Sequence, residues 1–575
     1  MYTLKYFDIL KQNAALRETN KDIKPYRIKV LSNITCNQLK EVLSFVLYTE
    51  HVNPVITFGN YDNIIQESFQ SAGEDMVVVQ YDLVNILDKY ATFVESFDEQ
   101  ELNAVQETIQ SEVDLILTNL AGVPSLVWNT FSSKGVHSNA LLSPKCKKLE
   151  ASLNEYLQSR PNTNLNVLDI NDVIAEVGVK AAYDFKMYFL SKTLYTIDFW
   201  KAYSMSLLPL VLRNSGKARK AIIFDCDNTL WKGILGEDGE AGIDMSPQTK
   251  IGKIFNKVQQ IAVWLSRQGI LVGLCSKNNP ADVDRVLENH DEMVLRKDDI
   301  VSLRINWEDK ASNLCSIAAE LNIGLDSLVF VDDSSFEINL IREQLPMVHC
   351  LQVPEAIHDY PGALLKTISR YFYLTGSSAD LEKKDQYKVQ ALRNELKNKF
   401  SSIDDYLASI ELEITVVMND SANIGRIAEL TQKTNQFNLT TKRYTEAQVE
   451  AFMKTEGTTV FSVSVRDKFG DSGLTAVCVV EFDGVAIVDT FLMSCRVMGR
   501  NIEKALMDVV MREAAHRGCA KVIAKYVRSQ KNESIHEFYD DMGFKCIQSE
   551  NDVKVYEIAT RTYVYNNLRY ININN

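Results

Sequence analysis

The chain has 575 residues, enough for roughly three or four domains, and its hydrophobic content of 46% is ample for packed cores. The formal net charge is −14 and there is no dense tract of lysine and arginine, so nucleic acid is not an expected partner. Ten cysteines form no CxxC pair, and neither a signal peptide nor a membrane-spanning apolar run is evident, so we expect a cytoplasmic protein without structural zinc, disulfides or a membrane partner.

Short, predominantly apolar runs alternate with helical patterns in the first part of the chain. The runs lie at residues 27–31, 55–58, 76–80 and 166–169. Runs of this length between helical stretches are typical of buried strands. We therefore expect a separate doubly wound α/β domain over residues 1–213.

The apolar run at residues 221–224 leads directly into two carboxylates, Asp225 and Asp227. A strand of an open α/β sheet delivers the residues at its carboxyl end into the crevice where ligands bind. Because Asp225 is ionised at neutral pH, it can attack phosphorus if a cation such as Mg²⁺ screens the incoming phosphate, while Asp227 handles protons. Such a pair alone is a weak signal, since acidic residues after strands are common in turns.

Three later segments make the pattern more specific. A second apolar run is followed by a hydroxyl, a cation and an amide that suit a phosphate group: Ser276, Lys277 and Asn278. Lys310 begins a helical pattern, where its ammonium would offset the charge of a phosphorylated aspartate, although a solvated helix lysine is the alternative. A further strand pattern ends at Asp332 and Asp333, whose oxygens would complete a metal site. Together the four segments predict a phosphoryl-transfer site.

This set of residues resembles the four motifs of the haloacid dehalogenase superfamily of phosphatases and phosphotransferases. The resemblance implies a role for each position: Asp225 as nucleophile, Asp227 as general acid/base and backbone metal ligand, Thr229 as a turn-stabilising residue of the phosphate site, Ser276 and Lys310 as phosphate ligands, and Asp332 as the last metal ligand. A metal-bound water would be held by Asp333 or by Glu337, and the sequence does not choose between them.

The residues within and between these motifs resemble one particular family within the superfamily. Residues 225–231, 236–239, 275–278 and 330–333 are similar to FkbH-like proteins, which dephosphorylate a phosphorylated glycolytic acid and load its acyl group onto an acyl carrier protein. This resemblance implies a haloacid dehalogenase-like parallel sheet over residues 214–375. It also implies Mg²⁺, an acyl carrier protein partner and a phosphorylated three-carbon acyl donor such as 1,3-bisphosphoglycerate, as in secondary metabolism.

The segments between the motifs are short, so no large cap domain fits. A glycine-rich flap at most would cover the site: Gly233, Gly236, Gly239 and Gly242. A site with so small a cover can admit a macromolecule such as a carrier protein, although small loops over a free metabolite are the alternative.

Two cysteines lie beside the motifs, and acyl transfer needs a thiol or an equivalent carrier. Cys226 stands between carboxylates that would raise its pKa, whereas Cys275 precedes Ser276 and lies near Lys277. Cys275 is therefore the better candidate for an acyl-accepting thiolate. The alternative is a packed cysteine, because free cysteine is among the most buried residue types.

In the FkbH-like resemblance, residues 1–213 are similar to an SGNH-hydrolase fold. Ser32 and Asn33 would lie near the nucleophile turn, with Gly59 and Asn60 in the second loop. No DxxH triplet appears near the end of this segment, so we find no Ser/His/Asp triad. We expect a binding or docking role for this domain.

A charge-rich helical stretch at residues 379–400 predicts a linker, bounded by residues 376–410. Beyond it, over residues 411–575, strand patterns separated by Asp-Gly and other glycine turns predict an antiparallel sheet. A helix expected over residues 502–517 begins with free backbone N–H groups, which suit pyrophosphate or phosphopantetheine.

The start of this helix resembles the acyl-CoA loop of GNAT N-acetyltransferases. The resemblance implies an α+β domain and four residues near a pantetheine arm: Arg496, Gly499, Asn532 and Tyr539. Asn501 stands where that loop usually has glycine or alanine. The loop would hold coenzyme A, the pantetheine arm of a carrier protein, or nothing if it is a structural remnant.

These observations predict a three-domain α/β enzyme that uses Mg²⁺ to dephosphorylate a phosphorylated acyl donor and passes a glyceryl group to a carrier protein. One alternative is a small-molecule phosphatase whose flanking domains only set specificity. The other is a GNAT-type acyltransferase or carrier-protein docking scaffold whose phosphatase site is idle.

Overall fold

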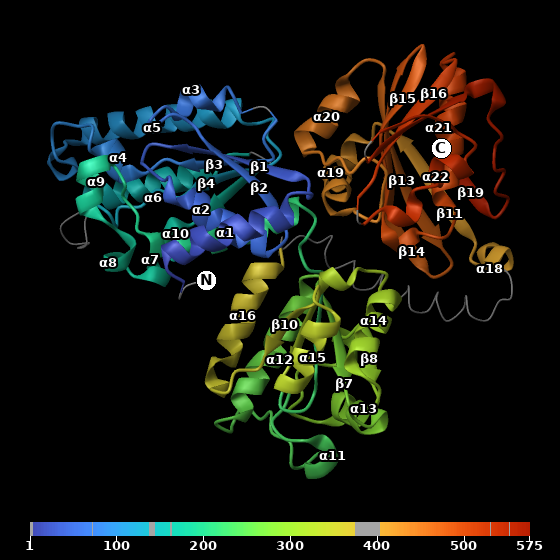
Figure 1. The fold of residues 1–575 in the computed structure, drawn as a ribbon, viewed down its shortest axis with the longest axis horizontal. Helices are drawn as coiled ribbons and strands as arrows, with labels where there is room; N and C mark the ends of the chain where they lie inside the picture. Colours follow the sequence, from blue (N-terminus) through green and yellow to red (C-terminus); the bar gives the residue numbers. More distant parts are fainter. Residues whose placement is uncertain are drawn as a thin grey trace. The chain divides into compact units, whose positions relative to one another are not determined.

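The computed structural model describes residues 4–71, 73–136, 144–161, 164–373, 403–529, 531–550 and 552–574. Within these ranges the chain forms three sheets with helices packed on them, so it is a multidomain α/β protein (Figure 1). Contacts within the chain define two compact units, Met1–Ser215 with Arg443–Gln448 and Gly216–Lys442 with Val449–Asn575.

The first sheet is parallel and has five strands in the order β2-β1-β3-β4-β5. Its strands are β1 (Pro25–Ser32), β2 (Asn53–Phe58), β3 (Met76–Gln80), β4 (Leu126–Asn129) and β5 (Leu165–Leu168). The longer helices of this domain are α1 (Tyr6–Asn20), α2 (Gln38–Thr49), α5 (Glu99–Asn119), α6 (Pro144–Gln158) and α10 (Ile197–Asn214). The predicted apolar runs coincide with β1, β2, β3 and β5, except that Asp169 lies just after β5, and the predicted doubly wound character is confirmed.

The second sheet is also parallel and has five strands, in the order β10-β9-β6-β7-β8. Its strands are β6 (Ala221–Phe224), β7 (Leu271–Ser276), β8 (Ser302–Ile305), β9 (Leu328–Asp332) and β10 (His349–Gln352). The helices are α12 (Gly252–Arg267), α13 (Pro280–Asn289), α14 (Lys310–Glu320), α15 (Ser335–Gln344) and α16 (Tyr360–Tyr371). Every residue of β6, β7 and β9 is buried, as expected for strands covered on both faces.

The segment between β6 and α12 is small. It holds the four-residue helix α11 (Leu235–Asp238) and an antiparallel bridge between Lys232 and Asp244. The short segment has no room for a further domain, which agrees with the prediction of a minimal cap.

The third sheet has its strands in the order β17-β18-β16-β15-β14-β13-β11-β19, and β12 pairs with β15 outside this path. Its strands are β11 (Leu412–Met418), β12 (Phe437–Asn438), β13 (Thr458–Asp467), β14 (Gly470–Asp483), β15 (Val485–Met493), β16 (Lys521–Val527), β17 (Lys545–Glu550), β18 (Val553–Ala559) and β19 (Ile571–Asn574). The helices include α18 (Ile403–Ser409), α19 (Ile424–Lys433), α20 (Glu446–Lys454), α21 (Ile502–His516) and α22 (Phe538–Asp541). Most neighbouring strands are antiparallel, as predicted.

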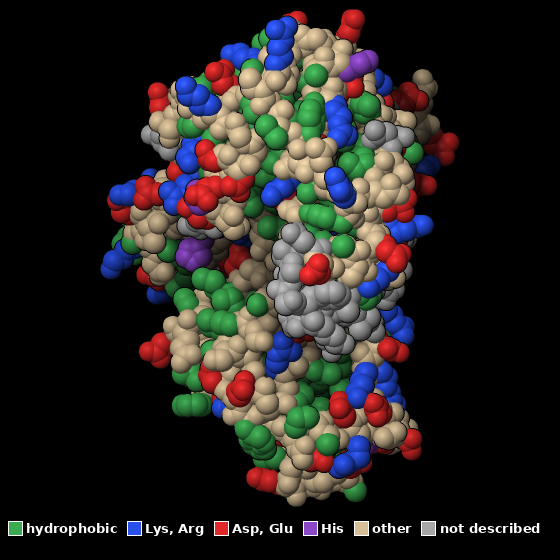
Figure 2. Space-filling view, turned by 90° about the vertical axis from the view of Figure 1, so that its right-hand side faces the viewer, with side chains coloured by type: hydrophobic (Ala, Val, Ile, Leu, Met, Phe, Trp, Pro, Cys, Tyr) green, Lys and Arg blue, Asp and Glu red, His purple; other side chains and the backbone are tan. Residues whose placement is uncertain are grey.

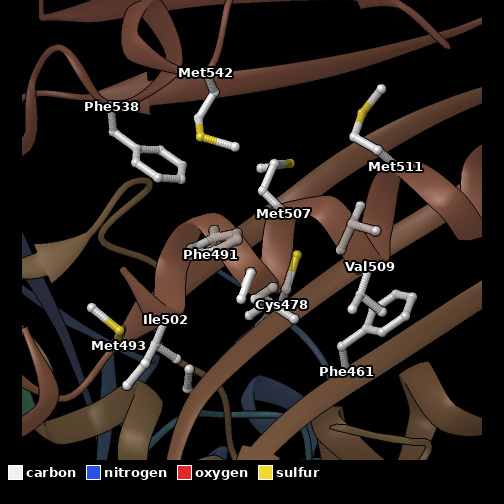
Figure 3. Packing of buried hydrophobic residues seen from close by; sticks show 14 of the residues in the cluster. Phe461, Cys478, Phe491, Met493, Ile502, Met507, Val509, Met511, Phe538 and Met542 are labelled. Atoms are coloured by element: carbon white, nitrogen blue, oxygen red, sulfur yellow. The ribbon is translucent and has the colours of Figure 1, made fainter. Parts of the chain in front are cut away.

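The core of this last domain lies between the sheet and its helices. Figure 3 shows Phe491 and Met493 of β15 among the side chains of this cluster, with Met507 from α21 and Phe538 from α22. Because aromatic and methionine side chains bury large apolar areas, this cluster is a main source of the domain's stability.

The predicted linker helix at residues 379–400 lies outside the described residues, and the domain boundaries stay predictions. Among the helices that the structure describes, none has the length and apolar character needed to cross a membrane. On the face drawn in Figure 2, acidic and basic side chains are interspersed.

Candidate active site

The predicted motifs meet at the carboxyl end of the central sheet. Asp225 follows β6, Asp332 ends β9 and Ser276 ends β7. β6 pairs with β9 on one side and with β7 on the other, so the three strand ends are neighbours. The strand order reverses between β6 and β9, and such a switch point is where open α/β sheets leave a crevice for ligands.

Lys310 is buried against the ends of β6 and β9 and does not lie on a solvated helix face. Its Nζ is 3.0 Å from an oxygen of Asp225 and 2.6 Å from an oxygen of Asp332, and its side chain is 5% exposed. Burial opposes the charge, but attraction to Asp225 and Asp332 prevails and raises the pKa of Lys310. The lysine is therefore a permanent cation between two carboxylates. Asp309 caps the helix by accepting a hydrogen bond from the Ser312 N–H at 2.8 Å.

Three carboxylates lie close together at this site, and two of them contact the ammonium of Lys310. Asp225, Asp332 and Asp333 each offer an oxygen, and these oxygens lie within 4.8 Å of one another. Burial, followed by repulsion from Asp225, raises the pKa of Asp332 to about 7, and the same causes raise the pKa of Asp333. Negative charge is thus in excess. An all-oxygen set of close carboxylates fits Mg²⁺, which prefers hard oxygen ligands.

The carboxylate of Asp227 is held away from this cluster by three donors. Its Oδ1 accepts from the Trp231 indole N–H at 2.9 Å and from the Leu235 N–H at 3.0 Å. Its Oδ2 accepts from the Asn278 amide at 2.8 Å. Sequence reasoning missed the roles of Trp231 and Asn278 in fixing this side chain. The four-residue spacing of Asp227 and Trp231 is the one signal that could have indicated the contact.

Glu337 and Lys277 form an ion pair at the edge of the site, with 2.7 Å between Nζ and Oε1. The Oε1 of Glu337 is therefore occupied by Lys277, while its buried Oε2 has no partner among the described residues, and Asp333 belongs to the carboxylate cluster. Of the two candidates that the sequence left open for holding a metal-bound water, the geometry favours Asp333. Burial raises the pKa of Asp225, against the lowering effects of Lys310 and, to a smaller extent, of the Ser276 hydroxyl.

Thr229 lies in the turn that follows β6. Its N–H donates to the Cys226 carbonyl at 3.1 Å, and its hydroxyl is buried without a partner among the described residues. Asn228 adopts a left-handed φ of 51°, which asparagine tolerates better than most residues. The turn brings the chain back toward Gly233, whose carbonyl accepts from the Asn228 N–H.

The two cysteines beside the motifs are fully buried. Burial raises the pKa of Cys275 to about 12, and burial with repulsion from Asp225 raises the pKa of Cys226 well above its ordinary value. Cys275 packs in an apolar cluster with Leu314 and Phe330. Neither sulfur is placed to act as a thiolate, so the expectation of an acyl-accepting Cys275 gives way to the packed-cysteine alternative.

Of the residues predicted to contact a pantetheine arm, one lies in the turn before α21 and two are buried in the domain interior. Gly499 precedes α21 with a φ of 76°, and the side chain of Arg496 lies outside the described residues. Asn532 is fully buried, donates to the Asn438 and Val527 carbonyls at 2.9 Å each, and accepts from the Ser529 N–H at 2.7 Å.

Tyr539, the fourth predicted pantetheine residue, is 1% exposed, and its hydroxyl has no partner among the described residues. Asn532 and Tyr539 therefore belong to the domain interior. The structure does not bring either side chain to the surface.

The SGNH-like positions form a local turn. The Ser32 hydroxyl donates to the Ile34 carbonyl at 2.8 Å, and Asn33 is fully buried, with its amide donating to the Asp82 carbonyl at 2.9 Å. The hydroxyl of Ser32 is thus used within its own turn.

Comparison with solved structures shows that much of the chain shares an α/β fold with a known protein. The chain is similar to the N-terminal part of the protein BF1531 from Bacteroides fragilis, which contains a phosphatase domain and was crystallised in complex with Mg. The identity is 24% over 64% of this chain and 98% of that chain, with a TM-score of 0.56, which shows a shared fold.

A second similarity is to the N-acetyltransferase of Escherichia coli that acts on the alanine of ribosomal protein S18, with 12% identity over 27% of this chain and 97% of that chain. Its TM-score of 0.22 is too low to support an argument. No family model and no curated protein matches the chain.

Proposed function

We propose that the central domain is a Mg²⁺-dependent phosphohydrolase of the haloacid dehalogenase type. The observation that carries this proposal is the cluster of Asp225, Asp332 and Asp333 at the switch point of the sheet, with Lys310 in contact with the first two. Three close carboxylates with one ammonium have an excess of negative charge that a divalent cation would neutralise. The Mg in the BF1531 structure supports the same choice of ion.

Each residue has a role that its position supports. Asp225 attacks phosphorus, the bond between phosphorus and the leaving oxygen breaks, and water later releases phosphate from the aspartyl phosphate. Asp227, oriented by Trp231 and Asn278, donates a proton to the leaving group and then takes one from water. When bound to the three carboxylates, Mg²⁺ would screen the charge of the incoming phosphate.

Lys310 and Ser276 complete the proposed site. The ammonium of Lys310 touches Asp225 and would stay beside it when the carboxylate carries a phosphoryl group. The Ser276 hydroxyl faces Asp225 and would donate to a phosphate oxygen. Both groups are buried before substrate binds, so little reorganisation is needed at the moment of reaction.

The proposed substrate is a phosphorylated three-carbon acyl donor such as 1,3-bisphosphoglycerate, and the proposed acceptor is the pantetheine thiol of an acyl carrier protein. The FkbH-like wording of the motifs and the small cover of the site support both. The thiol would attack the carbonyl carbon of the acyl phosphate and displace phosphate, which gives a 3-phosphoglyceryl thioester. Hydrolysis of the remaining phosphate ester at Asp225 would then release a second phosphate and leave the glyceryl thioester. The buried positions of Cys226 and Cys275 favour direct transfer to the carrier without a cysteine relay.

The test is the intact mass of a holo-acyl carrier protein incubated with the enzyme, Mg²⁺ and enzymatically generated 1,3-bisphosphoglycerate. A glyceryl adduct on the carrier with the wild-type enzyme supports the complete proposal, provided that Asp225→Asn gives either no adduct or an adduct that still carries the phosphate ester. Cys275→Ala should leave the adduct unchanged, and loss of the adduct in that variant would restore the cysteine relay.

Phosphate release with no adduct on the carrier would leave the second candidate, a small-molecule phosphatase. The small cover over the site, which suits a free metabolite as well as a carrier, favours keeping this candidate. Binding of coenzyme A without Mg²⁺, in a chain that releases no phosphate from any tested ester, would instead support a GNAT-type or docking scaffold.

A further inference from the structure

A lysine and a glutamate form an ion pair at the carboxyl end of the second sheet, beside the proposed active site. Lys277 directly follows β7, and Glu337 lies in the first turn of α15, which follows β9. β6, the strand that leads into Asp225, lies between β7 and β9 in the sheet. Neighbouring strands are about 4.8 Å apart, so the 2.7 Å contact between Nζ and Oε1 bridges the end of the nucleophile's strand.

Glu337 is fixed relative to the carboxylate cluster by the turn that precedes it. The Ser334 N–H donates to Asp332 at 2.8 Å, and the Ser334 hydroxyl accepts from the Glu337 N–H at 3.3 Å. The Oε2 of Glu337 is buried and has no partner among the described residues, so the contact with Lys277 is the one that compensates this carboxylate. Because a buried carboxylate is costly unless it is paired, Glu337 holds the ammonium firmly.

Lys277 is the more exposed partner, and it has donors to spare. Its side chain is 38% exposed, whereas that of Glu337 is 10% exposed. An ammonium has three N–H donors, and among the described residues Glu337 takes one of them. Ser276, just before the lysine, ends β7 beside the nucleophile's strand. Asn278, just after it, donates to Asp227 at 2.8 Å. The ammonium is thus held close to the reacting groups with donors available to a ligand.

The charges around the site make this cation decisive for any further negative charge on a substrate. Asp225, Asp332 and Asp333 form a cluster that repels anions. Lys310 contacts Asp225 and Asp332, so its charge is already engaged by the cluster. An anionic group that lies beyond the reacting phosphate therefore depends on Lys277 for its neutralisation.

We propose that Lys277 is a specificity-determining residue that binds a second anionic group of the substrate, and that Glu337 is the positioning residue that holds its ammonium in place. The inference rests on the proposed phosphohydrolase function. The reacting phosphoryl group lies at Asp225, and the second group, a carboxylate or a phosphate, lies beside Lys277. Because the ammonium is placed before substrate binds, little side-chain freedom is lost on binding.

The kinetic test compares two esters that differ in one anionic group, 3-phosphoglycerate and glycerol 3-phosphate. With the full chain and Mg²⁺, we expect kcat/KM to be at least about tenfold higher for 3-phosphoglycerate, mainly through a lower KM, because only its carboxylate can accept a charge-assisted hydrogen bond from the lysine. Lys277→Met should reduce this ratio to less than about threefold, whereas Lys277→Arg should retain a preference because it keeps the charge. A loss of activity common to both esters does not change the ratio.

Lys297→Met is the matched control. The side chain of Lys297 is 36% exposed and pairs with Glu288 at 2.6 Å, but it precedes β8 and so lies at the amino end of the sheet. This variant should show the wild-type ratio. An equal drop in the ratio with Lys297→Met and Lys277→Met would overturn the assignment of the second group to Lys277.

Glu337→Asp tests the positioning role without a change of charge. The side chain is one methylene shorter, so the ammonium is drawn away from its place or released. We expect the ratio of the two kcat/KM values to fall at least about threefold, through a higher KM for 3-phosphoglycerate. An equal change of KM for both esters would show that Glu337 has a structural role only.

Calorimetry on the Asp225→Asn chain with Mg²⁺ tests binding apart from turnover. We expect 3-phosphoglycerate to bind at least about tenfold more tightly than glycerol 3-phosphate, and the further change Lys277→Met to remove most of the difference. Propane-1,3-diol bisphosphate is the third ligand, and its affinity relative to 3-phosphoglycerate distinguishes a second phosphate from a carboxylate as the preferred group.

The outcomes separate this inference from the function on which it rests. Equal affinity for all three ligands, or a preference that persists in Lys277→Met, would overturn the inference, while phosphate release by the wild type would still support the phosphohydrolase. A preference that depends on Lys277, in a wild-type chain that releases no phosphate from any of the three, would instead support the anion-binding lysine and contradict the phosphohydrolase.

Discussion

The two parallel sheets of this chain have similar architecture, but the polar groups at their switch points differ. Those of the first sheet are paired with one another, whereas those of the second include a cluster of carboxylates. Each has five strands, and the strand order reverses between β1 and β3 in the first and between β6 and β9 in the second. At the first switch point, the side-chain amide of Asn33 donates to the Asp82 carbonyl at 2.9 Å, and the side-chain oxygen of Asn33 accepts from the Asp82 N–H at 2.8 Å. At the second, Asp225 and Asp332 share the ammonium of Lys310, and a third carboxylate, that of Asp333, lies close to both.

The difference lies in whether the chain satisfies its own polar groups. The carboxylate of Asp82 accepts from the Tyr195 hydroxyl at 2.5 Å and from the Val84 N–H at 2.9 Å. Asp332 also accepts a backbone N–H, that of Ser334 at 2.8 Å, but among the described residues Lys310 is the cation that contacts both Asp225 and Asp332. A switch point provides a crevice, but excess charge within it is what requires an external ligand.

The largest expected effect separates the two switch points by activity. Asp225→Asn should lower phosphate release at least about 1,000-fold, because the amide cannot attack phosphorus. Asp82→Asn should leave phosphate release within about twofold, since its carboxylate only holds its own domain together. Both are measured as phosphate release in saturating Mg²⁺. Comparable losses in the two variants would show that the N-terminal switch point participates in the reaction.

Each of the two domains with a parallel sheet also has a buried lysine, Lys29 in β1 and Lys310 at the start of α14, and the effects of removing them should differ in their response to Mg²⁺. Lys310→Met leaves Asp225 and Asp332 without a cation and should cost about 3–5 kcal/mol of unfolding free energy. Mg²⁺ should recover part of this loss by neutralising the same carboxylates. Lys29→Met removes the 2.9 Å ion pair with Glu67, and its loss should not respond to Mg²⁺.

Urea unfolding of both lysine variants with Mg²⁺ and with EDTA gives the measurement. The two variants are matched, because each replaces a buried ammonium with an apolar chain of similar length. Recovery of Lys29→Met by Mg²⁺ would place a cation site in the first sheet and remove the contrast between the sheets.

Mg²⁺ itself should stabilise the wild-type central domain. At a concentration 100 times the dissociation constant, binding to the folded state adds about 2.7 kcal/mol. Asp333→Asn should reduce this gain by removing one charge from the cluster, whereas Glu337→Gln should retain it because Glu337 is paired with Lys277. Thermal unfolding with and without Mg²⁺ measures the gain. A larger loss with Glu337→Gln than with Asp333→Asn would assign the ion to the other carboxylate.

The strands and the acidic ends of β6 and β9 could be predicted because both depend on local sequence. An apolar run followed by carboxylates predicts a buried strand whose carboxyl end carries the acidic residues of a site. The burial of Lys310 could not be predicted with the same certainty, because a lysine at a helix start is equally compatible with solvent. Only the approach of α14 to the ends of β6 and β9 decides it.

Two features show what sequence reasoning omitted. Cys275 and Ser276 are adjacent in a strand and point to opposite faces, so a serine in the site already requires a cysteine in the core. This argument was available from sequence. The pairing of Phe437 with Met493 was not, because a two-residue strand has no periodicity and its partner lies far along the chain.

The smallest effect that we predict is a pH dependence at the N-terminal switch point. Burial raises the pKa of Asp82 to about 6, against the lowering effect of its hydrogen bonds from Tyr195 and Val84. In the unfolded chain the carboxyl titrates near its ordinary value of about 3.9. Between these values the folded state binds the proton more tightly, so the contribution of Asp82 to stability is present at low pH. It is lost as pH rises through about 6, by about 1.4 kcal/mol per pH unit in that window.

Asp82→Asn should abolish this pH-dependent contribution to the free energy of unfolding, because the amide does not titrate. The difference in unfolding free energy between wild type and Asp82→Asn should therefore shift in favour of the variant as pH rises from 4.5 to 6, and then remain constant. Urea unfolding at several pH values, followed by fluorescence of the N-terminal domain's buried tryptophans, measures it. A difference that does not change with pH would mean that Asp82 ionises in the folded state as readily as in the unfolded chain. The first switch point would then carry an unneutralised buried charge, as the second does, and the contrast between the two sheets would rest on the number of carboxylates alone.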